Sequence, residues 1–319
     1  MMNTDWVSAA RSRPAETNGE KPLGDVLRAH AAWLQGFGLG ARADLTNHTL
    51  NDADLPDSNL RMAQMTGATL LDANLAGSDL SGAILSNADF ERAVLTRADL
   101  TGADLSGAKF QSAWMTATNL SEAKLTGAVL RKARMAQCRL MDATVNECTF
   151  WGANLTEAAF HQAKLYECDF TEATLEGAFF MHTRAQLCRF VGTRAALANF
   201  TGARLSVCDL ANADLNGAKF ARAHCIRSKF HRAQMRDCDM RGAQFNGADL
   251  SRADLSGARL GEAVLSSADL RGANLRGARE LTQEQLLGAL TDDRTVLPNG
   301  KNGPFLRNSK AERPVLGGR

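Results

Sequence analysis

Large apolar residues recur at every fifth position along most of the chain. In DLSRADLSGARLGEAVLSSADLRGANLRGA, which spans 249–278, Leu stands at 250 and at each fifth residue up to 275. A period of five forms no stripe on an α-helix, and an odd step alternates the faces of a β-strand. The backbone must therefore turn a corner about once per pentapeptide, so that every large residue points inward.

The register runs without a break from Leu45 to Leu275. Most of these central residues are Leu, Phe or Met, and the weak ones are Ala185, Ala195 and Cys225. Two residues earlier stands Ala, Cys, Ser or Thr, with His48 as the exception. This pattern predicts that the centre and the small residue face the interior, while the other three positions of each repeat face water.

The consensus A-(D/N)-L-(S/T/R)-G resembles the pentapeptide-repeat family. NADLNGAKF at 212–220 and ADLTGADLSGAKF at 98–110 show it well. The resemblance implies an all-β solenoid, a right-handed quadrilateral parallel β-helix with four pentapeptides per coil. The repeats would then make about 12 coils, which bury their apolar residues only by stacking.

Segments outside the repeats predict short helical caps at both ends. Residues 23–40 carry apolar residues at helical spacing and an H-x-x-W-L segment that resembles the lead-in of many pentapeptide arrays. Residues 280–298 contain T-Q-E-Q, a capping-box start, followed by Leu286, Leu287 and Leu290, which we expect to cover the last coil. The resulting domains are a disordered segment 1–22, a capping helix 23–40, a β-helix 41–279, a capping helix and turn 280–298, and a flexible basic tail 299–319. The same leucines with Leu281 suggest a homodimer through the C-terminal cap.

Composition and motifs limit the classes of protein to which this chain can belong. The net charge is +2, and neither a membrane-spanning run nor the apolar core of a secretory signal is present, so we expect a cytoplasmic protein. The seven cysteines occupy inward positions of the repeat, where they serve as small apolar residues. Motifs for nucleophiles, zinc and phosphate are absent from the sequence. We therefore expect no enzyme, no catalytic residue, no cofactor and no metal.

Residues twenty apart should stack on successive coils. This rule predicts inner columns of cysteines and phenylalanines, to which Leu155 adds another core residue. The predicted structural core includes Leu155, Phe170, Phe190, Phe200, Cys148, Cys168, Cys188 and Cys208. A line of thiols cannot surround a metal tetrahedrally, so the cysteine column is interpreted as core packing and not as a redox or zinc ladder.

Outward positions are the candidates for function. Residues 41–120 are acidic by about five charges, whereas a basic belt lies at 184–241. Outward apolar residues gather in the same region as the belt, where Ala185 and Ala195 weaken the repeat. Two interpretations stay open there: the coil becomes irregular and turns Leu187 and Leu197 inward, or an exposed patch meets a partner. The candidate interaction surface comprises Phe179, Met181, Leu187, Val191, Leu197, Val207, Arg184, Arg204 and Arg227. Trp114 with Val94 forms a smaller candidate, and Trp151 is a separate outward aromatic residue.

Three functions fit these features. The leading one is a non-catalytic rigid scaffold that binds a protein partner of unknown identity through its outer faces. The alternative, implied by the family resemblance, is a DNA mimic that modulates type II topoisomerase and confers quinolone resistance. The third is binding of nucleic acid or an anionic membrane through the basic belt, which would depend on salt.

Overall fold

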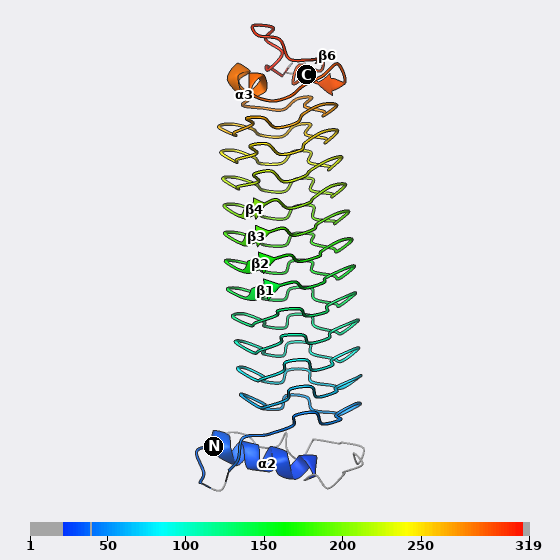
Figure 1. Cartoon of the computed structure of the whole chain (residues 1–319), viewed down its shortest axis with the longest axis vertical. Coiled ribbons are helices and arrows are strands. Elements are labelled where there is room, and N and C mark those ends of the chain that lie inside the picture. The colour runs from blue at the N-terminus through cyan, green and yellow to red at the C-terminus, as the bar shows by residue number, and fades with distance from the viewer. Residues whose placement is uncertain (1–21, 39, 315–319) are drawn as a thin grey trace, which may run out of the picture. The chain divides into compact units, whose positions relative to one another are not determined.

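The computed structural model describes residues 22–38 and 40–314, and it divides into an N-terminal unit, Met1–Ala159, and a C-terminal unit, Phe160–Arg319. Most of the predicted disordered segment 1–22 lies outside the described residues. Figure 1 shows that each unit consists of stacked coils, with short helices outside them.

The N-terminal unit begins with helix α2, Leu23–Leu34, and continues as coils of twenty residues. Parallel bridges join Asp44 to Gln64, Asp54 to Asn74 and Lys124 to Thr144, so each repeat pairs with the fourth repeat that follows. Strand β1, Thr144–Asn146, belongs to this unit. Helix α2 meets the first coil through two backbone donors: Ala41 N donates to Ala29 O at 3.0 Å, and Ala43 N donates to His30 Nδ1 at 3.1 Å.

The C-terminal unit has the same twenty-residue coil. Strands β2 (Lys164–Tyr166), β3 (Arg184–Gln186) and β4 (Arg204–Ser206) pair in parallel on successive coils. After the last coil come helix α3 (Gln283–Leu287) and the antiparallel strands β5 (Thr295–Val296) and β6 (Asn302–Gly303). Thr282 and Gln285 form the predicted capping box at the start of α3.

The predicted division into inward and outward positions holds in both units. Leu155 is fully buried, and so are nearly all other central residues and the small residues two positions earlier. Ala185 and Ala195 are buried as well, whereas Leu187 and Leu197 face outward. The coil therefore stays regular through 185–197, which excludes the irregular coil, and a contact with a partner there stays a prediction.

Aromatic and thiol columns fill the interior of the C-terminal unit. The ring centroids of Phe160, Phe180, Phe200 and Phe220 follow one another at 4.6–4.9 Å with nearly parallel planes. Phe170 and Phe190 stack at 4.8 Å in a second column. Cys168, Cys188 and Cys208 are buried in this unit, as Cys148 is in the N-terminal unit. All the predicted core residues thus lie inside the coils.

The second residue after each centre turns the corner with a left-handed backbone. Glycine occupies many of these positions, for example Gly217 with φ 67°, because glycine adopts positive φ without a steric penalty. Asn and Asp, which tolerate this conformation, occupy others. The corner therefore favours glycine without requiring it, since residues such as Arg92 and Glu122 adopt the same backbone there.

The C-terminal end differs from the prediction in two respects. Leu286 is buried, but Leu287 and Leu290 are exposed instead of covering the last coil. Residues 299–314, predicted as part of a flexible tail, are mostly exposed but are anchored: Phe305 is buried, and its N–H donates to Thr291 Oγ1 at 2.9 Å. An aromatic side chain gives this otherwise polar segment an apolar anchor. Residues 315–319 of the predicted tail lie outside the described residues.

Candidate interaction surface

Five of the nine predicted surface residues lie on one side of the C-terminal unit. Arg184 and Arg204 are paired in the register of β3 and β4, and Leu187 and Val207 follow at the adjoining corner, one on each coil. Arg227 continues the corner column on the next coil. We call Arg184, Leu187, Arg204, Val207 and Arg227 the basic–apolar surface.

The cations of this surface are not neutralised within the chain. In the described part of the protein, Arg184, Arg204 and Arg227 form no ion pair, although all are exposed. Lys164 and His224 extend the arginine column at its two ends. Some basic residues on other sides of the unit are paired, for example Arg236 with Asp254 at 2.5 Å and Arg241 with Asp239 at 2.6 Å. The positive charge of the basic–apolar surface therefore remains available to an anionic partner.

The apolar part of the surface is held in a strained backbone. Val207 has φ 57° and is the β-branched residue among the described non-glycine residues with positive φ. A β-branched side chain in this region is sterically unfavourable. Val207 is also 48% exposed, so the side chain gains little from burial. The coil itself gives no reason for valine at this corner, where Asn or Gly would be less strained.

Three of the other four predicted residues lie on different sides. Each pentapeptide turns a corner, so residues ten apart, such as Leu187 and Leu197, belong to opposite sides of the coil. Leu197, the most exposed of the set, lies against Gly217 of the next coil. Phe179 stacks on the ring of His161 at 5.8 Å. Phe179, Val191 and Leu197 therefore do not form one patch with Leu187, whereas Met181 lies at the corner that precedes Arg184.

Three residues that border the surface were not in the predicted set, although Arg222 belongs to the predicted basic belt. Lys164 belongs to the arginine column, exposed Ile226 lies beside Arg227, and Arg222 lies at the preceding corner. The twenty-residue spacing could have identified them, because Lys164 and Arg184 differ by one coil. Glu167 borders the surface as an acidic residue in the column of Leu187.

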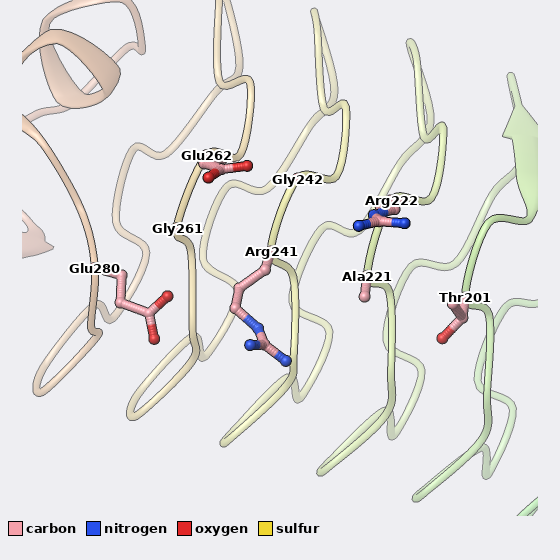
Figure 2. Close-up of a pocket in the computed structure, with 8 residues that line it drawn as sticks. All are labelled: Thr201, Ala221, Arg222, Arg241, Gly242, Gly261, Glu262 and Glu280. Atoms are coloured by element: carbon pink, nitrogen blue, oxygen red, sulfur yellow. The ribbon is translucent and has the colours of Figure 1, made fainter.

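A shallow groove of about 480 Å³ lies on the neighbouring side (Figure 2). Ala221, Gly242 and Gly261 leave space there, and Arg222, Arg241, Glu262 and Glu280 supply charges. Two of these charges are already engaged: Arg241 donates to Asp239 at 2.8 Å, and Glu280 accepts from Arg259 at 3.0 Å. Arg222 and Glu262 are thus the two charges of the groove without an ion pair among the described residues.

The acidic residues of the N-terminal unit serve its own turns. Asp44, Asp79, Asp99 and Asp104 each accept a hydrogen bond from the backbone N–H two residues on, at 2.9–3.1 Å. Salt bridges engage others, for example Asp72 with Arg92, whose hydrogen bonds hold the pKa of Asp72 below its ordinary value. Much of this acidity is therefore used locally and is not concentrated on one side.

Burial disfavours the thiolate form of three of the cysteines. Burial raises the pKa of Cys138 and Cys238 to about 12 and that of Cys225 well above its ordinary value. The described residues contain no group of His, Cys, Asp and Glu that could hold a metal ion. Within residues 22–38 and 40–314, no helix has the length and apolar character needed to cross a membrane.

The chain belongs to the pentapeptide repeat family. The family description "Pentapeptide repeats" matches eight copies, at residues 41–70, 73–111, 103–140, 146–181, 208–247 and 243–279, which together cover well over half of the chain. Proteins of this family are typically structural or interaction proteins. No curated protein matches the chain.

Solved structures of pentapeptide repeat proteins are similar to the chain. HetL, involved in heterocyst differentiation regulation in the cyanobacterium Nostoc sp. strain PCC 7120, is 26% identical, with 89% of this chain and 100% of HetL covered and a TM-score of 0.23. Full-length QnrB1, a plasmid-mediated fluoroquinolone resistance protein, is 17% identical, with 77% and 93% covered and a TM-score of 0.18. Rfr23 from the cyanobacterium Cyanothece 51142 is 23% identical, with 46% and 85% covered and a TM-score of 0.20. All three TM-scores are below 0.5, so the family assignment rests on the repeat sequence.

Proposed function

We propose that this protein is a non-catalytic scaffold that binds a protein partner through the basic–apolar surface. The partner would present carboxylates to Arg184, Arg204 and Arg227, and an apolar residue to Leu187 and Val207. The observation that carries the proposal is Val207, an exposed β-branched residue held at φ 57° beside unpaired arginines. Strain that a fold does not need is often found at binding sites.

The regular coil makes this surface suitable for recognition. The parallel ladder fixes Arg184 opposite Arg204 and Leu187 one coil from Val207, so a partner meets side chains on a rigid backbone. Because this backbone is already ordered, binding loses less conformational entropy, and the free-energy cost of association is smaller. Arginine fits carboxylates well because its planar fork donates two parallel hydrogen bonds.

Site-specific photo-crosslinking tests the proposal. A photoreactive amino acid would replace Gln186, on the basic–apolar surface, or Glu176, which is exposed on the opposite side. We expect a discrete crosslinked partner from Gln186 that disappears in Arg184→Glu/Arg204→Glu. The matched control, Arg194→Glu/Arg232→Glu, makes the same change in net charge on other sides and should retain the crosslink. Equal crosslinking from both positions, or a crosslink insensitive to the first double substitution, would contradict the proposal.

The topoisomerase alternative has less support. DNA mimicry requires a continuous negative surface, whereas the carboxylates of the N-terminal unit are engaged by their own turns and by salt bridges. A gyrase supercoiling assay distinguishes the two functions: a scaffold leaves supercoiling unchanged at micromolar protein, and a mimic inhibits it. Direct nucleic-acid binding through the basic belt would show a steep dependence on salt.

The segments at the two ends of the repeats have a role of their own in this proposal, as caps. An uncovered end of a β-helix would expose unpaired backbone groups to edge-to-edge association. We infer that α2 and the segment from α3 to residue 314 act as caps, on about 12 coils of the right-handed sense that family membership implies. Deletion of 280–319 should then cause aggregation, which size-exclusion chromatography would detect.

A further inference from the structure

Two outward tryptophans of the N-terminal unit are covered by cations of the coil between them. The guanidinium carbon of Arg134 lies 3.8 Å from the ring centroid of Trp114, on the preceding coil. Lys132 Nζ lies 5.3 Å from the ring centroid of Trp151, on the following coil. Arg131, beside Lys132, is exposed too. We call Trp114, Arg131, Lys132, Arg134 and Trp151 the tryptophan–cation patch.

This patch is positive in an otherwise acidic region. Arg131, Lys132 and Arg134 form no ion pair with any described residue, and the outward neighbours Gln111, Ser112, Gly152 and Asn154 are neutral. One coil earlier on the same side the charges are paired, since Arg92 bonds to Asp72 and Glu91, each at 2.7 Å. The three cations therefore face solvent with no counter-charge of their own.

A cation lies over one face of each tryptophan ring. Arg134 covers a face of Trp114, while the residue as a whole remains 46% exposed. Covered faces are poorly suited to stacking on nucleic-acid bases. Indole edges beside Lys and Arg suit the boundary between lipid headgroups and acyl chains, where amphipathic rings are favoured.

We propose that the tryptophan–cation patch docks the N-terminal unit on an anionic phospholipid bilayer. The three cations are complementary to the negative headgroups, and the tryptophan edges enter the interfacial layer. The patch covers one side of the coils, with Trp114 and Arg134, and the adjoining corner, with Arg131, Lys132 and Trp151. A duplex would need more phosphate contacts than three cations on one coil supply for comparable binding. This contact is independent of the basic–apolar surface.

Vesicle co-sedimentation tests the proposal with the full chain. The probes are phosphatidylcholine vesicles with and without about one-third phosphatidylserine. We expect binding only to the anionic vesicles, and a loss of that binding when salt rises from about 0.05 M to 0.5 M. Arg131→Gln/Lys132→Gln/Arg134→Gln should lower the partition coefficient by more than tenfold, since each cation contributes roughly fivefold.

Matched variants make the result specific. Arg61→Gln/Lys109→Gln/Lys124→Gln removes the same charge from other positions of the N-terminal unit and should keep at least a third of the binding. Brominated lipid should quench tryptophan fluorescence in the full chain and much less in Trp114→Phe/Trp151→Phe. Arg184→Glu/Arg204→Glu, which tests the proposed scaffold, should leave vesicle binding intact.

Three outcomes would overturn the proposal. One is the absence of binding to anionic vesicles at low salt. Another is an equal loss in the two glutamine triple variants, which would mean a dependence on net charge alone. The last is binding of a short DNA duplex that requires Arg131, Lys132 and Arg134 while vesicles do not bind.

Discussion

Leu187 and Val207 occupy the same corner of successive coils, and each has a φ of 57°. Both side chains are exposed, and the backbone joins the two coils through Leu187 N, which donates to Ser206 O at 3.2 Å. Of the two, the β-branched residue has the less favourable backbone. This pair therefore connects a local conformational cost to the surface that we propose for binding.

Relief of this strain should stabilise the coil. Val207→Asn places a residue that tolerates positive φ at the corner, and we expect a gain of about 1 kcal/mol in the free energy of unfolding. The reverse substitution, Asn212→Val at φ 58°, should lose a similar amount. Urea unfolding followed by circular dichroism measures both. A loss of stability in Val207→Asn would show that the valine contributes to folding.

Substitutions at adjacent positions should distinguish the inside from the outside of the coil. Leu155 is fully buried, so Leu155→Arg buries an unpaired charge and should unfold the surrounding coils. Asn154 is exposed, and its Oδ1 accepts from Thr156 N at 3.1 Å, so Asn154→Arg should cost only about 1 kcal/mol. Thermal unfolding compares the two variants. Equal damage would contradict the assignment of inward and outward positions.

Mild acid should weaken the junction between α2 and the first coil. Burial lowers the pKa of His30, whose neutral Nδ1 accepts from Ala43 N. The unfolded chain binds the proton more readily than the folded chain, so stability is full above about pH 6.5 and is lost as the pH falls below it. Hydrogen exchange of the Ala43 amide should accelerate between about pH 7 and pH 5 beyond the intrinsic change.

Substitution of the histidine provides the control for this pH effect. His30→Gln keeps an acceptor without a titrating group, so the extra dependence on pH should vanish. His231→Gln, on a distant coil, should leave the dependence unchanged. An identical pH profile in His30→Gln and in the unsubstituted chain would exclude His30 as its origin.

The exposed leucines at the C-terminal end should mediate self-association. Leu287 and Leu290 are 41% and 52% exposed, so a second copy could cover them. We expect a dimer at micromolar concentration and a monomer for Leu287→Glu/Leu290→Glu. Light scattering coupled to size-exclusion chromatography measures the mass. A monomer in the unsubstituted chain would contradict this expectation.

The interior could be predicted from sequence because inward residues obey a local rule. Leu155 or Phe190 points inward for the same reason as every other centre, and the rule holds even at Ala185. The surface could be predicted only in part. Phe179, Leu187 and Leu197 are close in sequence, but the chain passes to the next side of the coil at each corner. Neighbours on one side are therefore twenty residues apart in the sequence. The repeat pattern could not predict ion pairs, because they depend on the conformations of long side chains that extend from one coil to the next, as that of Arg236 extends to Asp254.

The seven buried thiols allow the local unfolding of individual coils to be followed separately. Each cysteine sits at a known height in its unit, and a shielded thiol reacts with an alkylating reagent only after its surroundings open. Alkylation under mild denaturation would label Cys138, Cys208 and Cys238 in a particular order. That order would therefore show where unfolding starts and in which direction it spreads. The native cysteines therefore serve as probes of local unfolding, and no further cysteine has to be introduced.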